Sequence, residues 1–400
     1  MTAKKSTVSI LLTLIMLLCT NCSFSEPVNN NESTATVQSS QTVVNTTTSE
    51  KAVQTTDDII NSMTMHEKIC QLFVVTPEQL TCVEGVTAAD KTTKKSLKKY
   101  PVGGIVYFSG NIVSEEQLTE MTKNSQSYSK IPLLIATDEE GGDVARIAGT
   151  LDVAQLQPMF NYKDEGEEVA RQNAETIAKY LKKYGINTDF APIADVWSNP
   201  DNSVIGTRAY SNDFSQAEQL VASAVKGFKS QGEICTLKHF PGHGDTTQDS
   251  HEQLAHITRS VEQIKSEEFS VFRSGIEAGA DMVMVGHLII DELGDNTPAT
   301  LNKNIVTDML RDELGFNGVA ITDSMEMGAI ADNYGIGNAS VMAIEAGIDM
   351  ILMPSNLSEA VSAVEQAVTD GTLTEKRIDE SLQRIINMKI DNNIFKGIIG

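Results

Sequence analysis

Three of the chain's six histidines fall within fourteen residues, in the stretch KHFPGHGDTTQDSH at positions 238–251. A lysine, two aspartates, a proline and two glycines share this stretch. Histidine and aspartate side chains bind metal ions, transfer protons, or hold each other in a fixed orientation. Glycine-rich turns also form phosphate sites. The stretch is therefore compatible with a metal centre, a phosphate cradle or a loop that performs acid/base chemistry.

The residues around these histidines favour the acid/base interpretation. A metal ion needs several convergent ligands, but Lys238 places an ammonium beside His239, and the segment FPGHGD is typical of a turn. A phosphate cradle is disfavoured because Pro241 removes a backbone donor and acidic residues follow it. In the segment DSH, Asp249 could fix one tautomer of His251, so that the imidazole gives and takes a proton near neutral pH. We therefore predict a site without a metal or a cofactor.

A second candidate lies in AITDSMEM, residues 320–327, where Asp323 ends an apolar run. Taken alone, Asp323 is equally compatible with a helix N-cap, and the pair of Asp249 and His251 with an ordinary surface loop. Taken together, they supply a carboxylate and a separate proton donor. Retaining glycoside hydrolysis requires this combination, because one group attacks the anomeric carbon and the other protonates the leaving oxygen.

Eight apolar runs could supply the strands that position these residues. The runs are almost continuously apolar, as expected when both faces of a parallel sheet are covered. The predicted strands are residues 69–75, 102–108, 132–138, 187–196, 235–241, 281–287, 318–324 and 349–355. Polar side chains recur at their carboxyl ends, where barrel enzymes place their active sites. These side chains are Asp138, Asp195, Lys238, His239, His287 and Asp323.

Amphipathic helical patterns lie between the predicted strands, with apolar residues three and four positions apart. The patterns cover residues 114–129, 167–185, 215–232 and 260–279, and three of them end at a glycine. Two further helical patterns follow the last strand. This alternation predicts an α/β fold, a (β/α)8 TIM-type barrel, as a single catalytic domain over residues 57–400.

Five segments resemble glycoside hydrolase family 3, specifically its single-barrel β-N-acetylglucosaminidases, and the resemblance runs from about residue 57 to residue 390. The segments are ATDEEGGDVARI (136–147), FAPIADV (190–196), IGTRAY (205–210), LKHFPGHGDTTQDSH (237–251) and ITDSMEM (321–327). The last two segments together are highly specific to the family.

The resemblance implies a role for each matching residue. Asp323 would be the nucleophile, Asp249 with His251 would form the acid/base dyad, and Asp138 would bind sugar hydroxyls. The other residues implied to line the pocket for the sugar are Arg146, Arg208, Lys238 and His239. For the two arginines, a buried ion pair that supports the barrel is the alternative interpretation.

Two residues depart from the family's pattern. The family commonly has Gln and Arg where this chain has Glu139 and Asp143, so the contacts at the rim of the pocket are less well determined than the nucleophile. The resemblance implies a retaining exo-β-N-acetylglucosaminidase that acts on cell-wall fragments or chitin oligosaccharides. A histidine repels an anionic acceptor less than a carboxylate would, so phosphorolysis is an alternative. A β-glucosidase and a non-catalytic sugar-binding lipoprotein are further alternatives.

The first 22 residues have the layout of a secretory signal, with two lysines, the apolar run VSILLTLIMLL (8–18), and then Cys19 and Cys22. The run is shorter than the apolar segment that a membrane-spanning helix usually needs. A cysteine after such a run resembles a bacterial lipoprotein signal, and Cys22 is the better candidate for lipidation. A plainly secreted form and an uncleaved anchor are the alternatives. We expect an extracytoplasmic protein, secreted or attached by lipid to the outer face of the membrane.

Residues 23–56 are rich in Ser, Thr and Asn and include one aromatic residue, so this segment is predicted to be a flexible tether. The formal net charge of the chain is −23, which should repel nucleic acid. The cysteines after the tether are Cys70, Cys82 and Cys235. Their spacing matches neither a metal site nor a disulfide framework, which predicts buried or free thiols.

Overall fold

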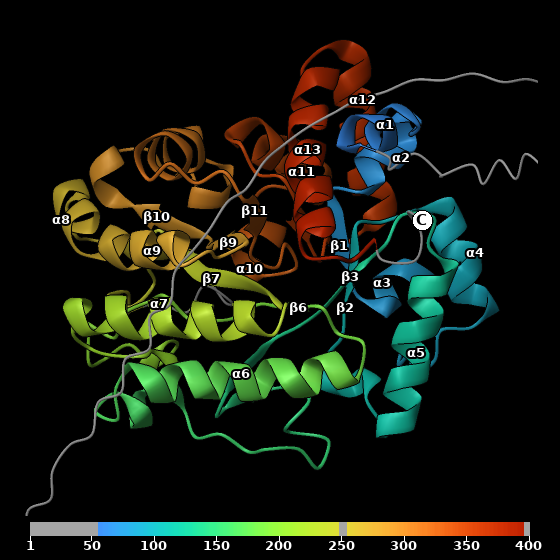
Figure 1. Cartoon of the computed structure of the whole chain (residues 1–400). Coiled ribbons are helices and arrows are strands. Elements are labelled where there is room, and N and C mark those ends of the chain that lie inside the picture. The colour runs from blue at the N-terminus through green and yellow to red at the C-terminus, as the bar shows by residue number, and fades with distance from the viewer. Residues whose placement is uncertain (1–54, 248–253, 396–400) are drawn as a thin grey trace, which may run out of the picture. The chain divides into compact units, whose positions relative to one another are not determined.

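The computed structural model describes residues 55–247 and 254–395. Cys22, Asp249 and His251 lie outside the described residues. Eight parallel strands pair in the order β11-β9-β7-β6-β3-β2-β1-β12. The first and last strands of this order also meet, because the Thr322 N–H donates to the Met350 carbonyl oxygen at 3.1 Å. The sheet therefore closes on itself, and the predicted TIM-type barrel is confirmed (Figure 1).

The strands of the barrel match the eight predicted runs, and all of them except the strand at 235–241 are shorter than predicted. They are β1 (Phe73–Val75), β2 (Gly104–Val106), β3 (Leu134–Thr137), β6 (Thr188–Asp189), β7 (Ile234–Phe240), β9 (Met282–Val285), β11 (Val319–Thr322) and β12 (Ile351–Leu352). The run at 69–75 begins in a helix, since Ile69 and Cys70 belong to α2. The run at 187–196 continues past β6 as irregular chain, where Pro192 has no N–H for the ladder.

Helices cover the outside of the barrel. The α-helices are α1 (Thr56–Asn61), α2 (Met65–Cys70), α3 (Pro77–Thr81), α4 (Lys91–Lys99), α5 (Glu115–Tyr128), α6 (Glu167–Lys183), α7 (Phe214–Ser230), α8 (Val261–Ser266), α9 (Glu268–Glu277), α10 (Gly328–Ala331), α11 (Ile336–Ala346), α12 (Leu357–Asp370) and α13 (Glu375–Asp391). A π-helix spans Asn304–Glu313, and short 3-10 turns span Ser109–Asn111, Met159–Tyr162, Gly206–Arg208, Asp291–Leu293 and Ala299–Leu301.

Local sequence signals explain where several helices end. Gly185, Gly232 and Gly279 follow α6, α7 and α9 with φ of 75°, 72° and 101°, a left-handed conformation that glycine adopts without steric cost. The prediction of a single helix at 260–279 is wrong, because this segment forms two helices, α8 and α9. Glu267 separates α8 from α9 with φ −116° and ψ −70°.

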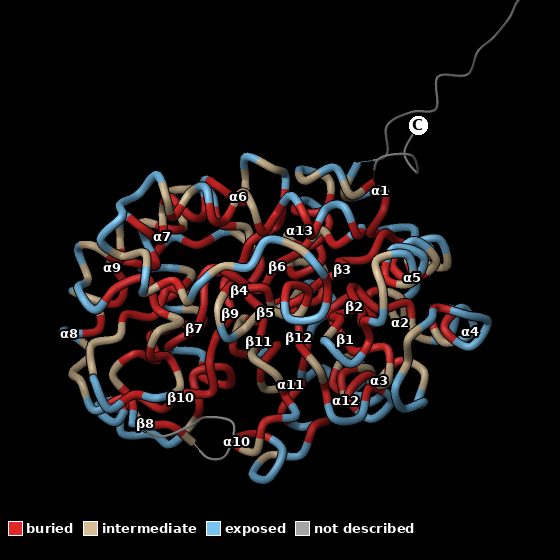
Figure 2. The backbone as a smooth tube through the Cα atoms, turned by 90° about the horizontal axis from the view of Figure 1, so that it is seen from below, coloured by how far each residue is buried: buried red, intermediate tan, exposed pale blue. Residues whose placement is uncertain are grey.

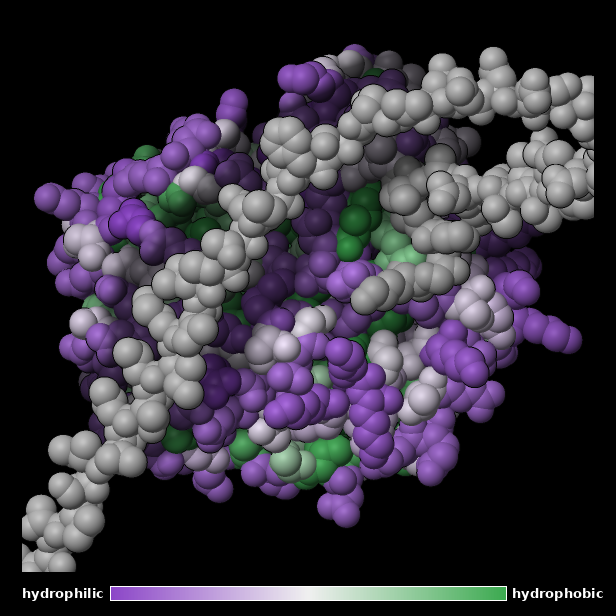
Figure 3. Space-filling model, viewed as in Figure 1, coloured by the Kyte–Doolittle hydropathy of each residue, from purple (hydrophilic) through white to green (hydrophobic). Residues whose placement is uncertain are grey.

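The buried residues, red in Figure 2, concentrate on the strands and on the inner faces of the helices. The face of the molecule in Figure 3 is mostly hydrophilic, which fits the large net charge. Among the described helices, none combines the length and the hydropathy needed to cross a membrane. Cys70, Cys82 and Cys235 are free thiols, as predicted.

Two small sheets lie beyond the carboxyl ends of the barrel strands. β4 (Glu139–Gly141) and β5 (Val144–Ala145) form an antiparallel hairpin directly after β3. β8 (Ala255–Ile257) pairs in parallel with β10 (Leu288–Ile290), which follows β9. Of these additions, the β4–β5 hairpin contributes Glu140 and Val144 to the pocket described below.

Candidate active site

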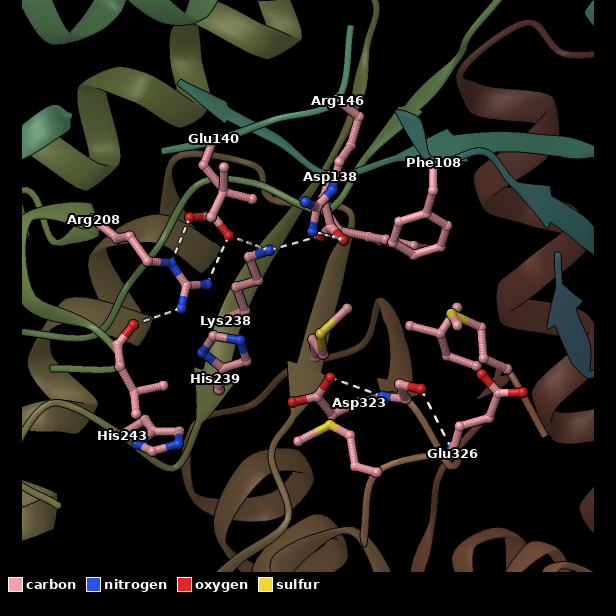
Figure 4. A pocket seen from close by; sticks show the side chains of 18 residues that line it. Phe108, Asp138, Glu140, Arg146, Arg208, Lys238, His239, His243, Asp323 and Glu326 are labelled. Atoms are coloured by element: carbon pink, nitrogen blue, oxygen red, sulfur yellow. Dashed lines mark hydrogen bonds and ion pairs between the residues drawn. The ribbon is translucent and has the colours of Figure 1, made fainter. Parts of the chain in front are cut away.

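A pocket of about 450 Å³ lies at the carboxyl ends of the barrel strands (Figure 4). Six of the eight residues predicted to act on a sugar line it, namely Asp138, Arg146, Arg208, Lys238, His239 and Asp323. The other two, Asp249 and His251, lie outside the described residues. The pocket wall therefore combines side chains of β7 with side chains that directly follow β3 and β11, and the sequence places these segments far apart.

A buried network of charges forms one wall of the pocket. The Lys238 ammonium lies between two carboxylates, 2.9 Å from Asp138 Oδ1 and 2.6 Å from Glu140 Oε1 (Figure 4). Arg208 donates to both oxygens of Glu140, from Nε and from Nη2, each at 2.8 Å. Lys238 and Glu140 are buried. The network fixes Asp138 at the pocket surface, where it can accept hydrogen bonds from hydroxyl groups.

The charges in this network keep one another ionised. Burial alone would raise the pKa of Glu140, but the positive charges of Lys238 and Arg208 outweigh it and hold the pKa well below its ordinary value. Burial would likewise lower the pKa of Lys238, but the charges of Asp138 and Glu140 raise it above its usual value. The wall is therefore a fixed set of charges at neutral pH.

Replacement of Lys238 by methionine should destabilise the barrel by about 3 kcal/mol, because the buried Glu140 carboxylate loses one of its two cationic partners. The control is Lys130→Met, which breaks an ion pair with Glu67 in which the lysine side chain is 60% exposed, and it should cost less than about 1 kcal/mol. Urea-induced unfolding measures both free energies. Equal stabilities of the two variants would show that the Lys238 network does not support the fold.

Arg146 lies beside this network. Its Nη2 is 3.7 Å from Asp138 Oδ2, and its guanidinium lies over the ring of Phe108, 5.3 Å from the ring centroid. The Arg146 side chain is 32% exposed, and its buried Nε has no hydrogen-bond partner in the described part of the chain. Arg146 therefore lies within ion-pair distance of Asp138 on the wall of the pocket.

Asp195, at the end of an apolar run, organises the histidines of the pocket. Asp195 Oδ2 accepts from His239 Nδ1 at 2.7 Å, and Oδ1 accepts from the backbone N–H of His243 at 2.6 Å. Burial would raise the pKa of Asp195, but the charge and hydrogen bond of His239 lower it below its ordinary value. The carboxylate places the His239 proton on Nδ1, which leaves Nε2 for a ligand.

Asp323 follows β11 and lies away from Glu140 and Arg208 across the pocket (Figure 4). Its N–H donates to the Val285 carbonyl oxygen at 2.9 Å, which ties it to the neighbouring strand. The Ser324 N–H donates to Asp323 Oδ1 at 2.7 Å and so helps to hold the carboxylate in place. His287 Nε2 lies 2.9 Å from the Ser324 carbonyl oxygen and supports the same turn. A carboxylate fixed on the barrel rim in this way is suited to nucleophilic attack.

Glu139 and Asp143, the two residues that depart from the family's pattern, differ in how far they are buried. Glu139 is fully buried and accepts from the N–H groups of Ile147 and Ala148, at 2.7 and 2.9 Å, and from the Tyr180 hydroxyl at 2.8 Å. It therefore holds the chain that follows the β4–β5 hairpin. Asp143 is exposed on the turn of the hairpin.

Comparisons with known proteins identify the family of the chain. The model of the glycosyl hydrolase family 3 N-terminal domain matches residues 64–388. The chain belongs to glycosyl hydrolase family 3. It is 34% identical over 312 residues to a beta-hexosaminidase of Idiomarina loihiensis, covering 77% of this chain and 90% of that protein. The family assignment confirms the resemblance on which the site residues were predicted.

Other relatives of this family 3 barrel are longer. It is 31% identical over 337 residues to beta-hexosaminidase A of Pseudoalteromonas piscicida, which covers 77% of this chain but 56% of that protein. The structure of a family 3 beta-N-acetylglucosaminidase from Paenibacillus sp. str. FPU-7 superimposes with a TM-score of 0.79 at 34% identity, over 84% of this chain and 64% of that one. The chain thus spans less than two thirds of both proteins.

Sequence reasoning did not assign the site's central carboxylate, Glu140, although it lies in a quoted motif two residues after Asp138. It also missed the apolar part of the pocket, which is lined by Phe108, Phe190, Met284, Met327, Leu352 and Met353. Within residues 55–247 and 254–395, no group of three His, Cys, Asp or Glu side chains is arranged to hold a metal ion.

Proposed function

We propose that this family 3 barrel is a retaining, exo-acting β-N-acetylglucosaminidase that removes terminal β-linked N-acetylglucosamine. The observation that carries the proposal is the placement of Asp323 in one pocket with the charge-fixed Asp138 and Lys238. The beta-hexosaminidases of Idiomarina and Pseudoalteromonas and the Paenibacillus enzyme support the choice of sugar.

The buried network supports exo action. Glu140, Arg208 and Lys238 fill the pocket wall behind Asp138 with paired charges that are costly to displace. We therefore expect a sugar that donates its hydroxyls to Asp138 to meet this wall, which suits the end of a sugar chain rather than its interior.

The proposed reaction is a double displacement. An oxygen of Asp323 forms a bond to the anomeric carbon while the bond from that carbon to the leaving oxygen breaks, and His251 gives its proton to that oxygen. Water then attacks the same carbon and gives a proton back to His251, and the bond to Asp323 breaks. Asp249 would hold the imidazole in the required tautomer.

Hydrogen bonds hold the described residues that precede Asp249 and His251 in the sequence. Asn202 Nδ2 donates to the His243 carbonyl oxygen at 2.7 Å, and Asn199 Nδ2 donates to that of Asp245 at 3.2 Å. With the bonds of Asp195 described above, these contacts anchor the stretch from His239 to Asp245 at the pocket wall. An anchored stretch is a suitable base from which to present an acid/base pair.

The test is an assay with aryl β-glycosides that share one aglycone and differ at the 2-position of the sugar. We expect the turnover of the 2-acetamido sugar to be clearly higher than that of the 2-hydroxy sugar. A preference for the hydroxyl would identify a β-glucosidase instead, and no turnover of any member would favour a sugar-binding protein.

Phosphorolysis is a second candidate, because the predicted proton donor is a histidine rather than a carboxylate. The same assay with and without inorganic phosphate separates the two reactions. Free N-acetylglucosamine as the sole sugar product in both conditions supports hydrolysis, whereas a sugar 1-phosphate would establish the phosphorylase.

We further propose that the chain is lipidated at Cys22 and acts outside the membrane on cell-wall fragments or chitin oligosaccharides. The signal-like residues 1–22 motivate this proposal. Expression of the full chain in a bacterium should place the protein in the membrane fraction, and Cys22→Ala should release it. An unchanged distribution of the variant would argue against lipidation.

A further inference from the structure

Glu268 is a buried carboxylate outside the pocket that contacts two separate segments of the chain. It is the first residue of α9 and is 7% exposed. Its Oε1 accepts from Arg259 Nη1 at 2.6 Å. A Cβ added to Gly242 would lie 2.5 Å from Glu268 Cγ, so the backbone of Gly242 packs directly on this side chain.

The two segments that Glu268 contacts flank the residues of the proposed acid/base pair in the sequence. Gly242 lies in the anchored stretch before Asp249 and His251, and Arg259 follows them, after β8. Arg259 is itself held, because its guanidinium lies over the ring of Phe214, 5.3 Å from the centroid. One side chain therefore contacts the chain on both sides of the pair, through its methylene groups at Gly242 and through its carboxylate at Arg259.

The environment of Glu268 makes its charge sensitive to pH in the neutral range. Burial raises the pKa of Glu268 to about 7, although the charge of Arg259 lowers it and that of Asp245 raises it. Glu267, the other charged neighbour on this turn, also pairs with Arg259. Glu268 Oε2 is buried and has no hydrogen-bond partner among the described residues. Protonation of Glu268 would therefore weaken its pairing with Arg259 without a compensating contact there.

We propose that Glu268 is a positioning residue for the acid/base chemistry, because its side chain packs on the Gly242 stretch while its carboxylate holds Arg259, and so sets how His251 is presented to the leaving oxygen. This inference rests on the proposed function, in which His251 donates the proton. Ionised Glu268 holds Arg259 through a charged hydrogen bond, which a neutral side chain replaces only weakly.

The test is Glu268→Gln, which keeps the shape of the side chain and removes its charge. Glu267→Gln is the matched control, because Glu267 also pairs with Arg259 but its side chain is 42% exposed and it is not the residue that packs on Gly242. Each variant is assayed between pH 5.5 and 8.5 with aryl β-N-acetylglucosaminides of good and poor leaving groups. Thermal melting shows whether each variant is folded.

At pH 8, Glu268→Gln should lower kcat/KM about tenfold for the substrate with the poor leaving group. The decrease should be much smaller for the substrate with the good leaving group, because only the poor leaving group depends on the proton from His251. In the parent enzyme kcat/KM for the poor leaving group should fall as the pH falls through about 7, and this step should be absent in Glu268→Gln. Glu268→Asp, which restores a charge, should recover part of the loss, and Glu267→Gln should behave as the parent.

A folded Glu268→Gln variant with an unchanged pH profile would overturn the inference. So would a loss of equal size for both leaving groups, which indicates a structural effect alone. Failure of the proposed function is recognised separately, because His251→Ala would then show no dependence on the leaving group. If that dependence is present, adding Glu268→Gln to His251→Ala should cause no further loss for the poor leaving group.

Discussion

Replacement of Asp323 by alanine should lower kcat by about 10⁴-fold or more, with the fold intact. The reason is that Asp323 supplies the atom that bonds to the sugar, and no other group in the reaction replaces a missing nucleophile. Steady-state hydrolysis of an aryl β-N-acetylglucosaminide measures the loss. Azide should restore part of the turnover, because a small anion fits the space that the carboxylate leaves and attacks the same carbon.

The control for this prediction is Asp332→Ala, which removes an exposed carboxylate that follows α10, nine residues along the chain. It should leave kcat unchanged. A folded Asp323→Ala variant with a substantial fraction of the parent's kcat would show that the nucleophile has been wrongly assigned.

Replacement of His251 by alanine should have an effect that depends on the aglycone. For a poor leaving group, which needs the proton, kcat/KM should fall by about 10²- to 10⁴-fold. For a good leaving group, such as a dinitrophenolate, kcat/KM should change little, because that aglycone departs without protonation. A plot of log kcat/KM against the pKa of the leaving group should therefore be steeper in the variant than in the parent.

His256 offers a matched control for this second prediction, because it also lies beside an aspartate. His256 Nδ1 is 2.6 Å from Asp291 Oδ1, and both side chains are partly exposed and do not line the pocket. His256→Ala should leave the slope of the plot unchanged. An equal slope in His251→Ala and the parent would remove His251 from the role of proton donor.

The barrel could be predicted from the sequence because its signals are local. An apolar run that ends in a polar residue, such as LLIATD before Glu139, marks both a buried strand and the end that carries function. Asp138 and Asp323 could be assigned to the mouth of the barrel for this reason. The glycines after α6, α7 and α9 mark helix ends by the same kind of local rule.

The parts that escaped prediction depend on contacts between distant residues. Glu140 becomes the centre of the charge network only because β7 brings Lys238, and a 3-10 turn brings Arg208, to the hairpin that follows β3. Glu268 lies in a continuous amphipathic pattern, and its periodicity does not reveal that the helix breaks at Glu267. Pairing of this kind depends on the fold, so a single sequence contains no local signal for it.

The most direct test of the account is to trap the enzyme with a slow substrate, a 2-acetamido-2-deoxy-5-fluoro glycoside with a reactive leaving group, and to sequence the labelled peptide. We expect one sugar per chain, bonded to Asp323, and a first-formed product with the β configuration of the substrate. A label on another residue, or a product of inverted configuration, would contradict it.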